Sequence, residues 1–179
     1  MSNDLFLRPG ADRRLAAGHL WVFSNEVDVQ RSPLQAFAAG DLVQVRRSTG
    51  ALLGSAYMEP QALICARLYA HGLDQVLSSH WLQALVARAL ASREALLPGG
   101  CYRLIYGDSD SIPGLVVDRF GDYLVMQFHN AGIERHEAAV IDALVKVLQP
   151  AGILLRADSR SRREQGLADR VEVVFGEVP

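Results

Sequence analysis

Residues 102–128 of this chain read YRLIYGDSDSIPGLVVDRFGDYLVMQF. Three runs within this segment, 102–106, 115–120 and 123–128, are rich in branched and aromatic residues and are typical of strands that bury one face. Gly121 and Asp122 join the last two runs, and such a pair favours a tight hairpin turn. The segment therefore predicts an antiparallel meander of three strands, with a longer loop between the first and the second.

That longer loop consists of turn-forming residues. Residues 107–111 read GDSDS. Pro113 and Gly114 fit the two central positions of a type II turn, because proline fixes its own φ and glycine tolerates a positive one. We expect Gly114 to adopt a positive φ.

The loop and the strand after it contain three acidic residues, Asp108, Asp110 and Asp118, which raise the question of a metal or acid–base site. The Asp108-x-Asp110 spacing resembles the opening of a calcium loop, but the twelfth position is Arg119 rather than glutamate. We favour an architectural role, in which aspartates hydrogen-bond the loop backbone and Asp118 pairs with an arginine. Catalysis is the alternative, and no Cys/His spacing predicts a metal site.

Helical patterns flank the meander on both sides. Ser78 or Ser79 can cap a helix over residues 80–97, which has an apolar stripe. A second helical period covers residues 134–148, and an apolar run at 153–155 predicts one more strand. We predict an α+β domain over residues 78–170, in which helices cover one face of a sheet.

The N-terminal third has a different pattern. Short strand candidates lie at residues 4–8, 19–25, 42–46, 51–57 and 63–69, and one short helix is expected at 11–17. Closely spaced short strands predict a small β-barrel. We place this domain at residues 1–73, followed by a linker.

Composition excludes several classes of protein. Half of the chain is apolar and 21% is charged, as in folded soluble proteins. No segment approaches the ~18 apolar residues of a membrane span, and residues 1–10 lack a signal-peptide pattern. No Gly-x-Gly follows a predicted strand to hold a nucleotide cofactor. We expect a cytoplasmic protein with reduced cysteines.

The charge pattern leaves nucleic-acid binding open. The net charge is −2, and 17 of the 18 basic residues are arginine. This bias reflects either genomic base composition or selection for guanidinium groups that bind phosphate. The arginines cluster modestly at residues 13–14, 46–47 and 156–163.

Eleven residues of the meander form a recognisable pattern: Gly107, Asp108, Asp110, Pro113, Gly114, Leu115, Asp118, Arg119, Phe120, Gly121 and Gln127. This pattern resembles the middle domain of a bacterial family, the S-adenosylmethionine-dependent 23S rRNA cytosine-C5 methyltransferases with an N-terminal PUA domain. The family has Glu where Asp108 stands and Gly where Ser111 stands. Residues 19–24, HLWVFS, resemble the His-Pro-Trp-Val-Phe-Ser of its PUA domain, which is an RNA-binding pseudo-barrel. Residues 156–167 resemble the segment before its catalytic domain, with Gln165 at a glutamate position.

The resemblance implies a division of labour. In the family, the S-adenosylmethionine-binding Rossmann-type domain and the catalytic cysteine lie beyond the point that corresponds to Pro179. We therefore expect residues 171–179 to begin a link to that domain. The parent protein would be an enzyme, whereas this chain would bind no cofactor, contain no catalytic residue and be inactive alone. Its expected partner is ribosomal RNA, with a homodimer as a further option.

Candidate RNA-binding residues follow from the same reading. Phosphates would contact arginines, and an unpaired base would stack on the tryptophan ring. The alternatives are that Trp21 and His19 belong to a packed barrel rim, and that Arg67 pairs with a carboxylate. The candidates are Arg13, Arg14, His19, Trp21 and Arg67 in the N-terminal domain, and Arg160, Arg162 and Arg163 in the basic tail.

Two other functions remain open at this point. One is a free-standing RNA-binding or ribosome-assembly module, and the other is a dimerisation scaffold without RNA affinity. The reading frame after Pro179 discriminates between the first of these and the methyltransferase, because a glycine-rich βαβ unit there would supply the cofactor site.

Overall fold

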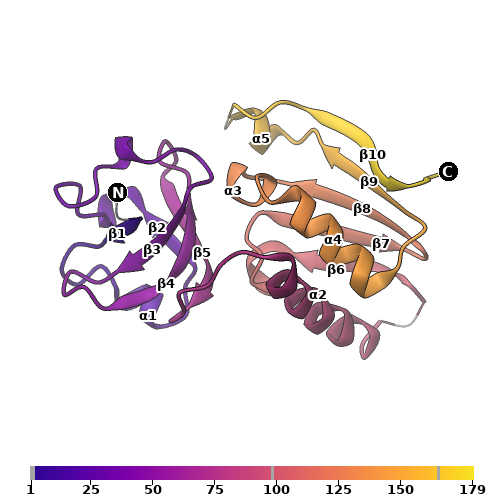
Figure 1. Ribbon diagram of the computed structural model, residues 1–179, viewed down its shortest axis with the longest axis horizontal. Coiled ribbons are helices and arrows are strands. Elements are labelled where there is room, and N and C mark those ends of the chain that lie inside the picture. The colour runs from indigo at the N-terminus through magenta and orange to yellow at the C-terminus, as the bar shows by residue number, and fades with distance from the viewer. Residues whose placement is uncertain (1–2, 98, 165) are drawn as a thin grey trace. The chain divides into compact units, whose positions relative to one another are not determined.

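The structure is a computed structural model that describes residues 3–97, 99–164 and 166–179; Gln165 therefore lies outside the described residues. The chain forms two compact units, an N-terminal unit that ends at Val76 and a C-terminal unit that begins at Leu77. Each unit contains a five-stranded sheet of its own (Figure 1). The predicted fold class, a PUA-like β unit followed by an α+β unit, is confirmed.

The N-terminal unit is a half-barrel whose strands follow the order β1-β3-β4-β5-β2. β1 runs parallel to β3, and the other pairs are antiparallel. A short helix, α1, lies between the first two strands in sequence. The elements are β1 Asp4–Phe6, α1 Arg13–Ala16, β2 Trp21–Phe23, β3 Leu42–Arg46, β4 Leu52–Met58 and β5 Ile64–His71, with 3₁₀ turns at Ser24–Glu26 and Leu34–Ala36.

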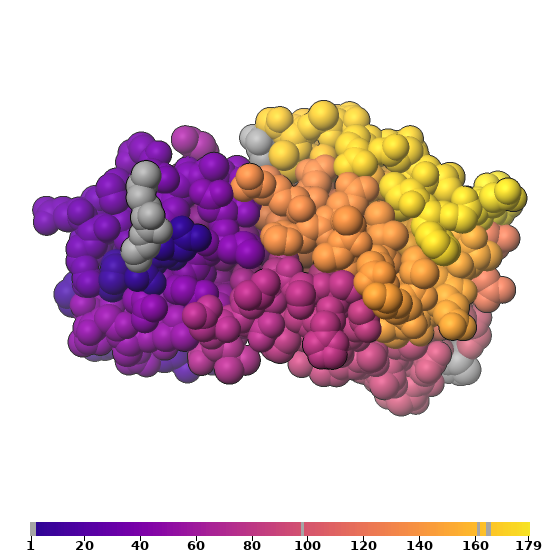
Figure 2. Space-filling view, viewed as in Figure 1, coloured from indigo at the N-terminus to yellow at the C-terminus, as the bar shows by residue number. Residues whose placement is uncertain are grey.

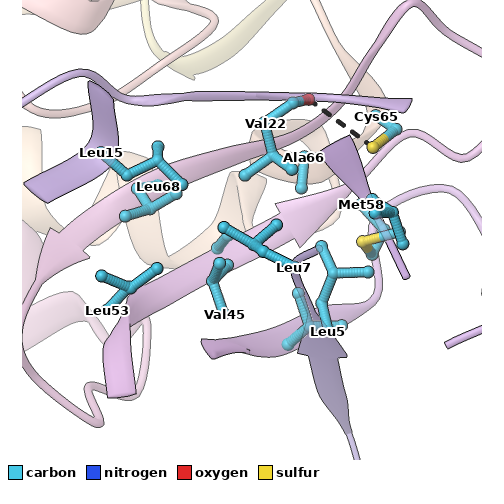
Figure 3. Packing of buried hydrophobic residues seen from close by; sticks show 13 residues of the cluster. Leu5, Leu7, Leu15, Val22, Val45, Leu53, Met58, Cys65, Ala66 and Leu68 are labelled. Atoms are coloured by element: carbon cyan, nitrogen blue, oxygen red, sulfur yellow. Dashed lines mark hydrogen bonds between the residues drawn. The ribbon is translucent and has the colours of Figure 1, made fainter. Parts of the chain in front are cut away.

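Apolar side chains from all five strands fill the concave side of this half-barrel (Figure 3). Val22 of β2 and Ala66 of β5 are fully buried there, and the Cys65 thiol donates to the Val22 carbonyl at 3.6 Å. Burying one branched side chain stabilises the fold by about 1.5–3 kcal/mol. Because side chains alternate along a strand, the neighbours Trp21 and Arg67 occupy the opposite side of the sheet.

The sheet of the C-terminal unit follows the order β10-β9-β8-β7-β6. β6, β7 and β8 form the predicted antiparallel meander, and β9 pairs with β8 in parallel after a helical crossover. The elements are α2 Ser79–Glu94, β6 Cys101–Tyr106, β7 Leu115–Phe120, β8 Tyr123–Phe128, α3 Ala131–Glu134, α4 Glu137–Leu148, β9 Gly152–Ala157, α5 Arg160–Glu164 and β10 Arg170–Gly176, with a 3₁₀ turn at Gly107–Asp110.

Helices α2 and α4 lie together over one face of this sheet (Figure 1), and their residues form a continuous layer in Figure 2, magenta beside orange. The Ser79 hydroxyl bonds the Asp142 carboxylate across the pair. Beneath them, Val117 and Met126 are fully buried at paired positions of β7 and β8. The predicted arrangement of helices on one face of a sheet is therefore confirmed.

Three details differ from the sequence-based expectations. The helix expected at residues 134–148 is split into α3 and α4, because Asn130 caps an earlier start by accepting from the Ile133 amide at 3.1 Å. The first helix of this unit ends at Glu94 rather than at residue 97. Residues 170–176, most of which were assigned to a link, form the edge strand β10 against β9.

Candidate nucleic-acid interface

Trp21 and Arg67 are direct neighbours on the outward side of the N-terminal sheet, where β2 pairs with β5. The Arg67 guanidinium carbon lies 5.6 Å from the centroid of the Trp21 ring, within the range of a cation–π contact. Trp21 is nevertheless 40% exposed, so the ring is not a packed core residue. The structure thus brings together two of the residues proposed from the sequence.

The Arg67 guanidinium has no hydrogen-bond or ion-pair partner among the residues that the structure describes, and its Nε is buried without an acceptor. The expectation that Arg67 pairs with a carboxylate is therefore wrong among the residues that the structure describes. A guanidinium withdrawn from water needs acceptors to offset the lost hydration. Arg67 is consequently the arginine of this surface with the most to gain from an anionic ligand.

Arg14 of α1 also reaches β2, but its charge is already balanced. Its Nη2 lies 2.8 and 2.9 Å from the two carboxylate oxygens of Glu26 and donates to the Trp21 carbonyl at 3.3 Å. The guanidinium also covers the Phe23 ring at 4.8 Å from its centroid. Arg14 therefore fastens α1 to β2, beside the exposed tryptophan.

Arg13 and His19 lie close to Arg14 in the sequence, and both are exposed. Neither side chain has a hydrogen-bond or ion-pair partner in the described part of the chain. The His19 amide donates to the Arg14 carbonyl at 3.1 Å, which holds the turn between α1 and β2. Both side chains are thus available to a ligand without first breaking an ion pair.

The three arginines of the basic tail have different environments. Arg162 is 1% exposed, and it bonds both carboxylate oxygens of Glu134 at 3.0 and 2.9 Å and the carbonyls of Phe128 and Ala168. This buried ion pair removes Arg162 from the RNA-binding candidates, because RNA cannot reach it in this fold. Arg163 is exposed and pairs with Asp169 at 3.0 Å, and Arg160 is exposed.

The acidic residues of the meander are used for architecture. Asp110 accepts from the Tyr106 amide and from Arg93, both at 2.7 Å, and Asp118 pairs with Arg103 at 2.8 Å. No group of three or more His, Cys, Asp or Glu side chains that could hold a metal occurs within the described ranges.

The remaining residues of the motif shape the same loop and strands. Gly114 has a φ of +80°, and the Leu115 amide bonds the Ile112 carbonyl across Pro113 and Gly114, as in a type II turn. A side chain at Gly114 would collide with Asn130, the residue that caps α3. Gly107 also has a positive φ and begins the 3₁₀ turn, in which Asp108 follows it. Arg119 donates to the Gly121 carbonyl at 2.9 Å, and Gln127 is half-buried on β8.

Sequence reasoning selected Trp21 and Arg67 separately and did not find their contact. Each residue is next to a fully buried apolar residue, Val22 after Trp21 and Ala66 before Arg67, and this alternation assigns both to the outward side. Only the pairing register of β2 with β5, which involves residues more than 40 positions apart, places them together. The buried role of Arg162 leaves no such periodic signal in the sequence.

Comparisons with known proteins place this geometry in context. Residues 5–71 match the PUA-like domain. The whole chain is 30% identical to the ribosomal RNA large subunit methyltransferase I of Tolumonas auensis, of which it covers 45%. It is 34% identical, over 97% of its length, to the protein of the same name from Shewanella denitrificans, of which it covers 44%. The chain thus spans less than half the length of these curated relatives.

The fold itself recurs in solved structures. The chain superposes over its full length on 44% of a SAM-dependent methyltransferase from Streptococcus mutans, with a TM-score of 0.80 and 18% identity. A methyltransferase solved in complex with SAH gives the same TM-score. At this identity the likeness establishes a shared fold. Within the residues described, no helix is long and apolar enough to cross a membrane.

Proposed function

We propose that this chain is the RNA-recognition and positioning part of an S-adenosylmethionine-dependent 23S rRNA cytosine-C5 methyltransferase. One observation carries the proposal: the similarity to ribosomal RNA large subunit methyltransferases extends over 97–100% of the chain. The proposal assigns cofactor binding and methyl transfer to the portion of the relatives' length that this chain does not cover.

The distribution of chemistry between the two units supports this assignment. The N-terminal unit presents an exposed ring and arginines without ion-pair partners, which are the groups that bind RNA bases and phosphates. Asp110 and Asp118 of the C-terminal unit are engaged in structural pairs with arginines. RNA binding therefore fits this chain better than a chemical step does.

Direct titration tests the proposal. The 179-residue chain should bind a fluorescently labelled 23S rRNA fragment, as measured by anisotropy, more tightly than it binds a DNA duplex of the same length. Affinity should fall as salt rises, because phosphate contacts release counterions. An equal affinity for both probes, or the absence of RNA binding at low salt, would overturn the proposal.

Calorimetry tests separately whether this chain binds the cofactor. We predict no specific heat of binding when S-adenosylmethionine is titrated into the chain, and no methyl transfer to the RNA fragment. The physical reason is that the sequence contains no glycine-rich turn between a strand and a helix, the feature that cradles such a cofactor. A micromolar dissociation constant for the cofactor would contradict this assignment.

A further inference from the structure

We propose that Trp21 and Arg67 form a subsite for one unpaired nucleotide, with the base on the tryptophan ring and the phosphate on the guanidinium. This inference rests on the proposed function and makes it more specific, because it names single-stranded RNA as the ligand and assigns the contact to two residues of neighbouring strands. Paired bases, whose faces are buried in the stack, cannot use such a subsite.

Trp21 is 40% exposed at the start of the short strand β2, and the Arg67 guanidinium lies over its ring. An exposed indole on a sheet surface offers a flat π-surface to a base. Stacking of this kind tolerates every base, because each has a π-face.

Arg67 is half-buried, and the described structure gives its guanidinium no acceptor, whereas Arg14 is matched by Glu26. A phosphate oxygen would supply the missing acceptor as a charge-assisted hydrogen bond, and the planar fork suits it. Arg14 is already paired with Glu26, so Arg67 is the better placed of these two arginines to bind a phosphate.

The Trp21 ring and the Arg67 guanidinium lie close enough for one ligand to reach both. The guanidinium lies 5.6 Å from the ring centroid, so an anion bound to Arg67 sits beside the ring rather than on a separate surface. A nucleotide also carries its phosphate beside its base. One ligand can therefore satisfy both groups, and a bare phosphate or a bare aromatic ligand satisfies only one.

Tryptophan emission offers a direct test in the full chain. The sequence contains two tryptophans, so the Trp81→Phe variant reports on Trp21 alone. A single-stranded RNA heptamer should quench this emission saturably, and a hairpin whose nucleotides are paired should not. Equal quenching by both probes would overturn the assignment to unpaired RNA.

Variants then separate the two groups. Trp21→Leu should weaken heptamer binding about 5- to 150-fold with an unchanged salt slope, as expected for one stacked base. Arg67→Met should weaken binding and reduce the log–log salt slope by about 0.7. Arg67→Lys, which keeps the charge, should retain most of that slope.

Arg31 provides a matched control, because its guanidinium also covers a ring of the N-terminal unit, Phe6, but is hydrogen-bonded to the Ser48 carbonyl. Arg31→Met should leave RNA affinity unchanged. If the wild-type chain binds RNA and neither Trp21→Leu nor Arg67→Met alters affinity, the subsite is refuted and the proposed function stands. If the wild-type chain binds no RNA, the proposed function itself fails.

Discussion

Arg162 and Arg163 are adjacent in the sequence and lie in opposite environments. Arg162 is buried against Glu134, and it joins α5 to the end of β8 through the Phe128 carbonyl at 3.0 Å. The Arg163 side chain is 60% exposed and pairs with an exposed aspartate. A basic cluster in the sequence therefore mixes a structural residue with a surface residue, and composition alone cannot separate them.

We predict that Arg162→Ala lowers the free energy of unfolding by about 3–5 kcal/mol, because it removes a buried guanidinium that bonds Glu134 and two backbone carbonyls. Glu134 would keep its longer contact to Arg170, at 3.6 Å. Arg163→Ala, the matched control, should cost less than about 1 kcal/mol. Urea denaturation followed by circular dichroism measures both values. Similar losses in the two variants would contradict the structural role of Arg162.

Gly114 and Gly121 both have a positive φ but differ in what a side chain would meet. Gly114→Ala should lower the free energy of unfolding by about 1–2 kcal/mol because alanine is strained in the left-handed backbone conformation. Displacing the Asn130 cap should lower it by about 0.5–2 kcal/mol more. Gly121 also has a positive φ, but a side chain there would meet open space, so Gly121→Ala should incur only the first cost. Denaturation midpoints that fall equally would show that Asn130 moves aside freely.

At the scale of elements, the strands of the meander were predicted almost to the residue because local signals agree there. Turn chemistry, branched residues and length all point to the same boundaries for β7 and β8. The prediction of a single helix was wrong because the apolar period continues through the break at Arg135 and His136. The Asn130 cap starts α3 before this break, so the segment forms two helices. β10 was missed because its neighbour β9 supplies the pairing, and pairing is not visible locally.

Strand β5 buries one side chain whose reactivity can be measured. Burial raises the pKa of Cys65 to about 12, so its thiol stays protonated and shielded, whereas Cys101 is exposed at the start of β6. We predict that a disulfide reagent at about pH 8 labels one thiol in the native chain and two after unfolding. Cys101→Ser should abolish native labelling. Rapid labelling of both thiols in the native chain would contradict the packing of β5.

At the scale of the whole molecule, most arginines serve the fold. Ion pairs such as Arg46–Asp4, Arg47–Asp12 and Arg93–Asp110 neutralise positive charge within each unit. With a net charge of −2, the chain has no global field that attracts RNA. Affinity must therefore come from local groups.

The sequence was sufficient to indicate two domains of different class. It was not sufficient to rank the arginines, because Arg13, Arg14 and Arg67 differ only in their three-dimensional partners. The pairing of Arg14 with Glu26 and the lack of an acceptor for Arg67 are properties of the folded half-barrel. These differences decide which residue is proposed to meet the ligand.

Photocrosslinking of a 23S rRNA fragment containing 4-thiouridine, followed by mass spectrometry of the crosslinked peptides, can show whether RNA contacts the N-terminal unit. We predict crosslinks within residues 13–23 and 64–71 of the N-terminal unit, where the exposed Trp21 ring and the Arg67 guanidinium lie. Crosslinks confined to residues 77–179 would contradict this prediction, as would their absence at RNA concentrations that saturate binding.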